Sequence, residues 1–207
     1  MDLERLETLL RTRKPGLMDA AGRYAVLVPL VEREGKLHLL YEVRARSMKR
    51  QPGEVCFPGG RMEPGEDPVA CALRETQEEL GIPVSAVRVL GELDFIGNRS
   101  NFIMYPVLGL VEEGAAANMR PNPAEVEETF LVPLEHLMKG PELEYEYRLR
   151  PEFGPEFPFE QLGIPRTYAW REGWENGPAY PWEGHVIWGL TGRITRHLIA
   201  LMGTNQG

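Results

Sequence analysis

The sequence predicts an α/β protein in which a mixed β-sheet is sandwiched between α-helices. Its length of 207 residues suits one domain with a full hydrophobic core and is too short for two domains of ordinary size. Hydrophobic residues make up 43% of the chain and charged residues 26%, proportions typical of a globular protein. Strand-like and helix-like segments alternate along it. We therefore expect a single domain spanning residues 1–207.

Hydrophobic periodicity predicts the individual helices and strands. An N-terminal helix over about residues 3–12 carries leucines at helical spacing on one face. A continuous apolar run, a turn containing glycine and an alternating segment then predict a β-hairpin. The predicted strands are residues 24–31, 36–46, 54–57, 84–93, 101–111 and 127–132, with a polar hairpin formed by 144–150 and 166–171. The remaining predicted helices are residues 67–80, 133–138 and 185–202.

The helix predicted over residues 67–80 has well-marked ends. Asp67 followed by Pro68 is a favourable N-cap and first-turn pair, and Gly81 suits the left-handed position that ends a helix. One side of this helix carries Val69, Leu73, Thr76 and Leu80. Because that side can dock on a hydrophobic core, we expect the opposite side to be presented to a ligand or to solvent.

Three glutamates lie on that opposite side. Residues three and four apart are neighbours on a helix, so Glu75, Glu78 and Glu79 share one face. Carboxylates this close repel one another unless a cation lies between them, and such hard oxygen ligands suit magnesium or manganese bound together with a substrate phosphate. Arg74, four residues before Glu78, can hold a carboxylate in place. Clustered glutamates are more often only a solvated helix face, but the capped ends and the apolar side favour a metal site.

The spacing of residues around this helix resembles the signature of the Nudix hydrolases. Gly60 is followed after five residues by Glu66, and after seven more by an Arg-Glu pair that leads into two further glutamates. The matching positions are Gly60, Glu66, Arg74, Glu75, Glu78, Glu79, Gly81 and Ile82. Thr76 departs from the pattern, because the family usually has an aliphatic residue there. The resemblance implies the Nudix fold and hydrolysis of a nucleoside diphosphate linked to another group.

The resemblance also implies a cofactor and roles for residues of this box. The implied ligands of Mg²⁺ or Mn²⁺ are Glu75, Glu78, Glu79 and the carbonyl of Gly59. Glu75 can instead act on the attacking water, and with Arg74 it makes up the catalytic pair of the box. Gly60 is assigned to substrate binding.

Family members often take a general base or an extra ligand from a loop outside the box. Glu125 is the candidate here, with Glu128 in reserve. The alternative interpretation is an acidic turn exposed to solvent.

The residues before the box resemble an additional motif of the coenzyme A diphosphatase branch. The matching positions are Arg44, Gly53 and the run Phe57-Pro58-Gly59-Gly60, while Ala45, Met48, Lys49 and Gln51 depart from the motif. This resemblance implies cleavage of coenzyme A or its thioesters to 3′,5′-ADP and 4′-phosphopantetheine. The alternatives are a Nudix hydrolase for ADP-ribose, dinucleotides or oxidised nucleotides, and a sensor of the same fold that binds a ligand without hydrolysis.

Four cationic side chains precede the box. They are Arg44, Arg46, Lys49 and Arg50. Coenzyme A carries a 3′-phosphate besides its diphosphate, and guanidinium and ammonium groups suit such a phosphate. We therefore expect these residues to bind substrate, and the alternative is a solvated strand end. Trp170, Trp174, Tyr180 and Trp182 can stack on adenine, although buried aromatic residues usually belong to a core.

The composition of the chain narrows the classes of partner that it is expected to bind. The net charge of −8 and the absence of a basic run argue against binding to a nucleic-acid backbone, and no apolar run approaches the length that spans a membrane. The charged N-terminus lacks the apolar core of a signal peptide, and two cysteines give no disulfide framework. We expect a cytoplasmic protein that binds a small nucleotide, with neither nucleic acid nor membrane as partner, and a homodimer stays open.

Overall fold

The computed structural model describes residues 3–13, 16–18, 20–97 and 101–203. The chain divides into two compact units, residues 1–28 with 58–120 and residues 29–57 with 121–207. The first contains α1 (Leu3–Thr12), the N-terminal part of β1 (Gly22–Arg33), β4 (Gly59–Arg61), α2 (Pro68–Leu80), a 3-10 turn (Val84–Ala86), β5 (Val87–Glu92), β6 (Ile96–Gly97), β7 (Phe102–Val111) and α3 (Glu113–Ala117). The second contains β2 (Lys36–Arg44), β3 (Val55–Cys56), β8 (Val126–Pro133), α4 (Leu134–Leu137), β9 (Leu143–Leu149), β10 (Gly173–Trp182), β11 (His185–Ile187) and α5 (Gly189–Gly203).

The main sheet has the strand order β3-β2-β1-β7-β5, and β4, β6 and β8 pair with β1, β7 and β2 respectively. A tight turn at Glu34 and Gly35, with φ of 54° and 72°, joins β1 to β2. Further along β1, Val26 lies opposite Gly59 of β4. The predicted α/β fold, a mixed sheet accompanied by helices, is confirmed.

The apolar runs of the sequence form the interior. Strand β1 is buried because its residues are apolar on both faces, unlike the alternating strands of a half-exposed sheet. In the first unit, the fully buried side chains include Ala25, Leu27, Val28, Cys71, Ala72, Leu80, Ile82 and Val107. Helix α2 contributes to this core with its apolar side and packs against β4 and β7. Of the predicted apolar side, Thr76 and Leu80 are buried and Val69 and Leu73 are half-buried, whereas Glu79, predicted on the opposite side, is buried too. The predicted docking of α2 is therefore observed in part.

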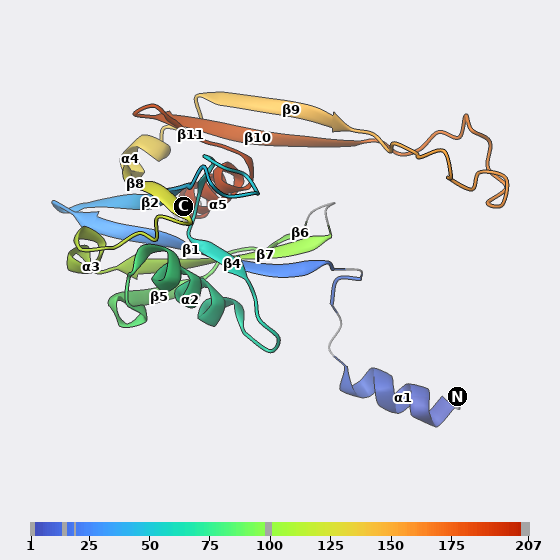
Figure 1. Ribbon diagram of the computed structural model, residues 1–207, viewed down its shortest axis with the longest axis horizontal. Helices are drawn as coiled ribbons and strands as arrows, with labels where there is room; N and C mark the ends of the chain where they lie inside the picture. Colours follow the sequence, from blue (N-terminus) through green and yellow to red (C-terminus); the bar gives the residue numbers. More distant parts are fainter. Residues whose placement is uncertain (1–2, 14–15, 19, 98–100, 204–207) are drawn as a thin grey trace. The chain divides into compact units, whose positions relative to one another are not determined.

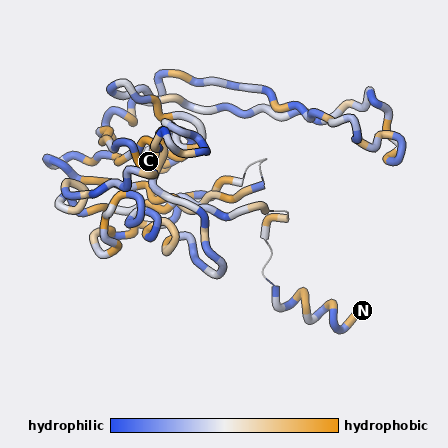
Figure 2. Tube along the Cα trace, in the orientation of Figure 1, coloured by the Kyte–Doolittle hydropathy of each residue, from blue (hydrophilic) through white to orange (hydrophobic). Residues whose placement is uncertain are grey.

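Helix α1 is confirmed at Leu3–Thr12, but it has no buried residue. Its leucines remain between 40% and 71% exposed. Figure 2 shows hydrophobic and hydrophilic residues alternating along it. Among the described helices, none is long and apolar enough to cross a membrane.

Two predicted elements near the C-terminus are wrong. The partner of β9 is β10, Gly173–Trp182, rather than residues 166–171. The glycines and prolines of β10 are typical of a loop, so only the pairing with β9 reveals it as a strand. The final helix begins at Gly189 rather than at 185, because His185–Ile187 pairs with β10 and Gly189 takes a φ of 61°.

Candidate active site

Local interactions hold helix α2 in the predicted position. One carboxylate oxygen of Asp67 accepts hydrogen bonds from the backbone N–H groups of Val69 at 3.0 Å and Ala70 at 3.1 Å. Gly81 ends the helix with a φ of 68°. Thr76, the departure from the family pattern, is fully buried and donates its hydroxyl to the carbonyl of Ala72 at 2.7 Å. The hydroxyl is therefore satisfied within the helix, and the substitution costs no unpaired polar group.

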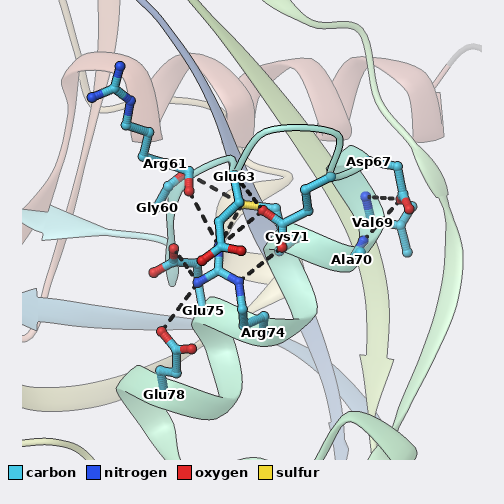
Figure 3. A network of polar contacts seen from close by, with 12 residues as sticks. Gly60, Arg61, Glu63, Asp67, Val69, Ala70, Cys71, Arg74, Glu75 and Glu78 are labelled. Carbon is cyan, nitrogen blue, oxygen red and sulfur yellow. Dashed lines mark hydrogen bonds and ion pairs between the residues drawn. The ribbon is translucent and has the colours of Figure 1, made fainter.

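The guanidinium of Arg74 organises the acidic face (Figure 3). It donates two hydrogen bonds to Glu66, from Nε at 2.9 Å and from Nη2 at 3.1 Å, in the forked arrangement that suits a carboxylate. Nη1 lies 2.7 Å from Glu75 Oε1 and 3.3 Å from Glu78 Oε2. Nη2 also donates to the carbonyl of Arg61 at 3.3 Å. One cation thus fixes three carboxylates that would otherwise repel one another.

These contacts shift the pKa values of Glu66 and Arg74. The hydrogen bonds from Arg74, and next the backbone N–H of Glu63, lower the pKa of Glu66 to about 2. The same carboxylate raises the pKa of Arg74 above its already high ordinary value. Both groups therefore stay ionised over the whole physiological pH range, so the ion pair between Arg74 and Glu66 persists near neutral pH.

Two glycines let β4 lie close to its neighbours, β1 at Gly59 and helix α2 at Gly60. The backbone N–H of Gly59 donates to Glu79 Oε2 at 2.7 Å, and Glu79 is only 5% exposed. A side chain at Gly59 would collide with the backbone of Val26, and one at Gly60 would overlap the carboxylate of Glu75. The missing side chain at Gly59 therefore lets β4 lie against β1, and the missing side chain at Gly60 leaves the space in which the Glu75 carboxylate lies.

The carboxylates beside Gly59 and Gly60 have some, but not all, of the features of a divalent-cation site. The donors are hard carboxylate oxygens, as a magnesium-like ion prefers, and the space beside Gly60 would be filled by any side chain there. Among the described residues, however, no three His, Cys, Asp or Glu side chains converge in a geometry that holds a metal ion. Glu75 and Glu78 each direct one oxygen to Arg74 instead. The donor chemistry fits such an ion. To ligate it, Glu75 and Glu78 must contact the ion while they also contact Arg74.

The predicted general base, Glu125, lies in the second unit. Asn122 Nδ2 donates to its Oε2 at 2.8 Å, and its backbone carbonyl accepts from Ala45 N–H at 2.8 Å. The turn that carries Glu125 is thus tied to the segment that follows β2. Glu128, the reserve, is 54% exposed and lies 3.7 Å from His185.

The predicted substrate-binding cations lie on that same segment. Arg44 is half-buried and its Nε donates to the carbonyl of Arg50 at 3.4 Å. Arg46 forms an ion pair with Glu127 at 3.2 Å, although its side chain is 81% exposed. Lys49 and Arg50 are exposed. The second unit therefore gathers the four cations and Glu125 around one pair of connected loops.

Sequence analysis missed a buried acid, Glu42 of β2. It is 1% exposed, its Oε1 accepts a hydrogen bond from the Cys56 thiol at 3.3 Å, and its Oε2 has no partner among the described residues. Burial raises the pKa of Glu42 to about 7 and the nearby Glu125 adds to the rise, while Cys56 and Arg44 oppose it. The signal was a single charged residue inside the apolar run of residues 39–43.

The aromatic residues considered for base stacking mostly belong to packed clusters. Tyr180 is 2% exposed. Trp170 packs 5.0 Å from the ring centre of Phe153, and Trp182 lies 4.6 Å from that of His136. These contacts favour the core interpretation.

Known relatives support the resemblance found in the sequence. The peroxisomal coenzyme A diphosphatase NUDT7 of Mus musculus is 40% identical over 131 residues, which are 63% of this chain and 54% of NUDT7. This chain thus spans about half the length of that relative. The mitochondrial coenzyme A diphosphatase NUDT8 of Mus musculus is 34% identical over 97% of this chain and 88% of its own. Nudix hydrolase 3 of Caenorhabditis elegans is 30% identical over 97% of this chain and 82% of its own.

The expected cytoplasmic location is wrong. Two of the three relatives are named as a peroxisomal and a mitochondrial enzyme. The features used for the prediction, cysteine usage and the absence of a signal-peptide pattern, separate secreted proteins from those of reducing compartments. They do not distinguish the cytoplasm from the interior of an organelle.

The sequence profile of the NUDIX domain matches residues 22–153, which include β1, the motif before the box, the box itself and the turn with Glu125. The match covers more than half of the chain and the residues that Arg74 and Gly59 bring together. The chain belongs to the Nudix family.

Proposed function

We propose that this protein hydrolyses the diphosphate of coenzyme A or its thioesters, releasing 3′,5′-ADP and 4′-phosphopantetheine. The observation that carries the reaction class is the acidic network of α2, in which Arg74 holds three carboxylates and Gly59 holds a fourth. The substrate is supported by the motif before the box and by two relatives named coenzyme A diphosphatases. The family profile runs through both compact units, which supports one Nudix domain over the chain.

Nudix hydrolases generally use divalent metal ions, and here Mg²⁺ or Mn²⁺ is the proposed cofactor. Glu75, Glu78, Glu79 and the carbonyl of Gly59 would hold it. When bound, the ion neutralises diphosphate charge and lowers the pKa of a coordinated water.

The residues of the chain itself supply orientation and proton transfer. Arg74 holds the carboxylates of Glu75 and Glu78 close together on one face of α2. Gly60, the residue assigned to substrate binding, leaves room for the Glu75 carboxylate to lie against β4. Glu125 accepts the proton of the attacking water, whose oxygen bonds to one phosphorus as the bridging P–O bond breaks. The leaving phosphate departs with the electron pair of that bond.

The cationic residues at the end of β2 and directly after it, Arg44, Arg46, Lys49 and Arg50, would determine the choice of substrate. Arg44, Lys49 and Arg50 are not ion-paired with a carboxylate among the described residues, whereas Arg46 is paired with Glu127. A 3′-phosphate can therefore be received by the three unpaired cations. A lost charge-assisted contact is worth roughly 1.5–3 kcal/mol, so dephospho-coenzyme A should be hydrolysed with an efficiency about 10- to 100-fold lower than coenzyme A.

The test compares kcat/KM for coenzyme A, dephospho-coenzyme A and ADP-ribose, with products identified by mass spectrometry. Lys49→Ala should reduce the preference for coenzyme A, and Lys139→Ala serves as a matched control that removes an exposed lysine outside the four cations. Equal efficiency for coenzyme A and its dephospho form would remove the 3′-phosphate from recognition. Binding of coenzyme A without any turnover would support the sensor instead.

A further inference from the structure

Strand β9 forms the outer edge of the three-stranded sheet of the second unit, whose order is β11-β10-β9 (Figure 1). One side of β9 pairs with β10, from Leu149 opposite Gly173 to Leu143 opposite Ala179. Along its other side, no strand of the described chain is hydrogen-bonded to it. Such an edge presents unpaired N–H and C=O groups to which another strand can bind.

The two faces of β9 differ in character. One face carries Leu143, Tyr145, Tyr147 and Leu149, and the other carries Glu144, Glu146 and Arg148, with Arg150 next in line. Leu143 is 62% exposed and Tyr147 46% exposed, while Tyr145 and Leu149 are half-buried, so the apolar face is partly exposed. The charges are sorted by sign, since both glutamates precede Tyr147 and both arginines follow it.

We propose that β9 pairs antiparallel with β9 of a second copy of this chain, with the two-fold axis at Tyr147. In this register Glu146 lies opposite Arg148 of the second copy, and Glu144 lies opposite Arg150 of the second copy. Every pair forms twice because the interface is two-fold symmetric. Opposite charges directly across an antiparallel pair are stabilising, and the two sheets join into one of six strands.

Other registers lose this complementarity. An axis at Glu146 places the two copies of its carboxylate face to face, and an axis at Tyr145 places Glu144 opposite Glu146 twice. Like charges directly opposite each other are destabilising. On the apolar face, the Tyr147 register sets Tyr145 against Leu149 of the second copy. Charge order therefore selects one register out of the neighbouring ones.

The contacts within one chain leave these charges available. Glu146 makes no ion pair among the described residues. The Arg148 guanidinium lies 4.6 Å from the ring centre of Trp174 and 3.3 Å from Glu172. With five N–H donors, it can bind a second acceptor as well.

Glu144 lies 3.6 Å from Arg196, and Arg150 lies 2.9 Å from Glu172. Exposed pairs of this kind are weak, so they compete little with contacts across the edge. The interface is small, and we expect a dimer that dissociates at micromolar concentration.

The experiment is sedimentation velocity of the full chain at increasing concentration. Glu146→Arg and Arg148→Glu each replace two attractive pairs by two repulsive ones and should weaken the dimer at least roughly 10-fold. The double variant carries both changes, restores opposite charges in the same register and should dimerise again. Glu160→Arg, an equal charge change at an exposed position outside β9, should leave dimerisation unchanged. Circular dichroism confirms that each variant is folded.

A cross-link tests the register directly. A residue on the axis lies opposite its own copy with Cα atoms about 4.5–5.5 Å apart, within the range of a disulfide. Tyr147→Cys should therefore form a covalent dimer under mild oxidation, and Glu146→Cys should not. The wild-type chain, with Cys56 and Cys71, is the control for other disulfides. A wild-type monomer at high micromolar concentration, a double variant that stays monomeric, or cross-linking at position 146 in place of 147 would overturn the proposal.

Discussion

The buried Glu42 makes a quantitative prediction about stability and pH. Its pKa rises from 4.5 to about 7 in the folded chain, chiefly because burial penalises the charged form. The folded state therefore binds this proton more tightly than the unfolded state. The contribution of Glu42 to the unfolding free energy is fully present below pH 4.5. It is lost as the pH rises towards 7, because the folded chain must then bury a charge.

The lost unfolding free energy is about 3 kcal/mol, because the pKa of Glu42 rises from 4.5 to about 7 on folding. Glu42→Gln keeps the shape of the side chain and cannot ionise. Relative to the wild type, the variant should become more stable by about this amount between pH 4.5 and pH 8. The Cys56 thiol can still donate to the amide oxygen of the new side chain, so the hydrogen bond at 3.3 Å is kept.

The assay is urea unfolding of both proteins at a series of pH values, with the difference in unfolding free energy plotted against pH. Taking this difference cancels the titration of groups that do not interact with Glu42. Glu142→Gln, a change at an exposed position, is the matched control and should give a flat difference. A flat difference for Glu42→Gln as well would refute the argument, since it would mean that the carboxyl group ionises as easily in the folded chain as in the unfolded one.

The other predictions concern catalysis. Glu79→Gln keeps an acceptor for the Gly59 N–H but removes the charge. Turnover in saturating Mg²⁺ should therefore fall roughly 100-fold, while the melting temperature is unchanged. Near-normal turnover would exclude Glu79 from the site. Gly60→Ala pushes a methyl group into the Glu75 carboxylate and should lower kcat at least roughly 10-fold, with unaltered kinetics as the contrary result. Glu125→Ala should depress kcat about 100-fold and Glu128→Ala only mildly, measured across pH with metal saturating. The reverse order would assign the base to Glu128, and two wild-type-like rates would confine the chemistry to α2.

The sequence by itself determined the features that depend on neighbours along the chain. The cap at Asp67, the end at Gly81 and the shared face of Glu75 and Glu78 follow from helical spacing, because their partners lie within four residues. The contact between Arg74 and Glu78 was predicted for the same reason and is observed at 3.3 Å.

Only the tertiary structure decided the features that join distant segments. The hydrogen bond between Gly59 and Glu79 spans 20 residues, and the pairing of β9 with β10 joins strands that a loop of more than 20 residues separates. No periodicity reports such pairings, since each depends on which surface folds against which. The same is true of Glu42, whose carboxyl group becomes a weak acid only because neighbouring strands remove water from it.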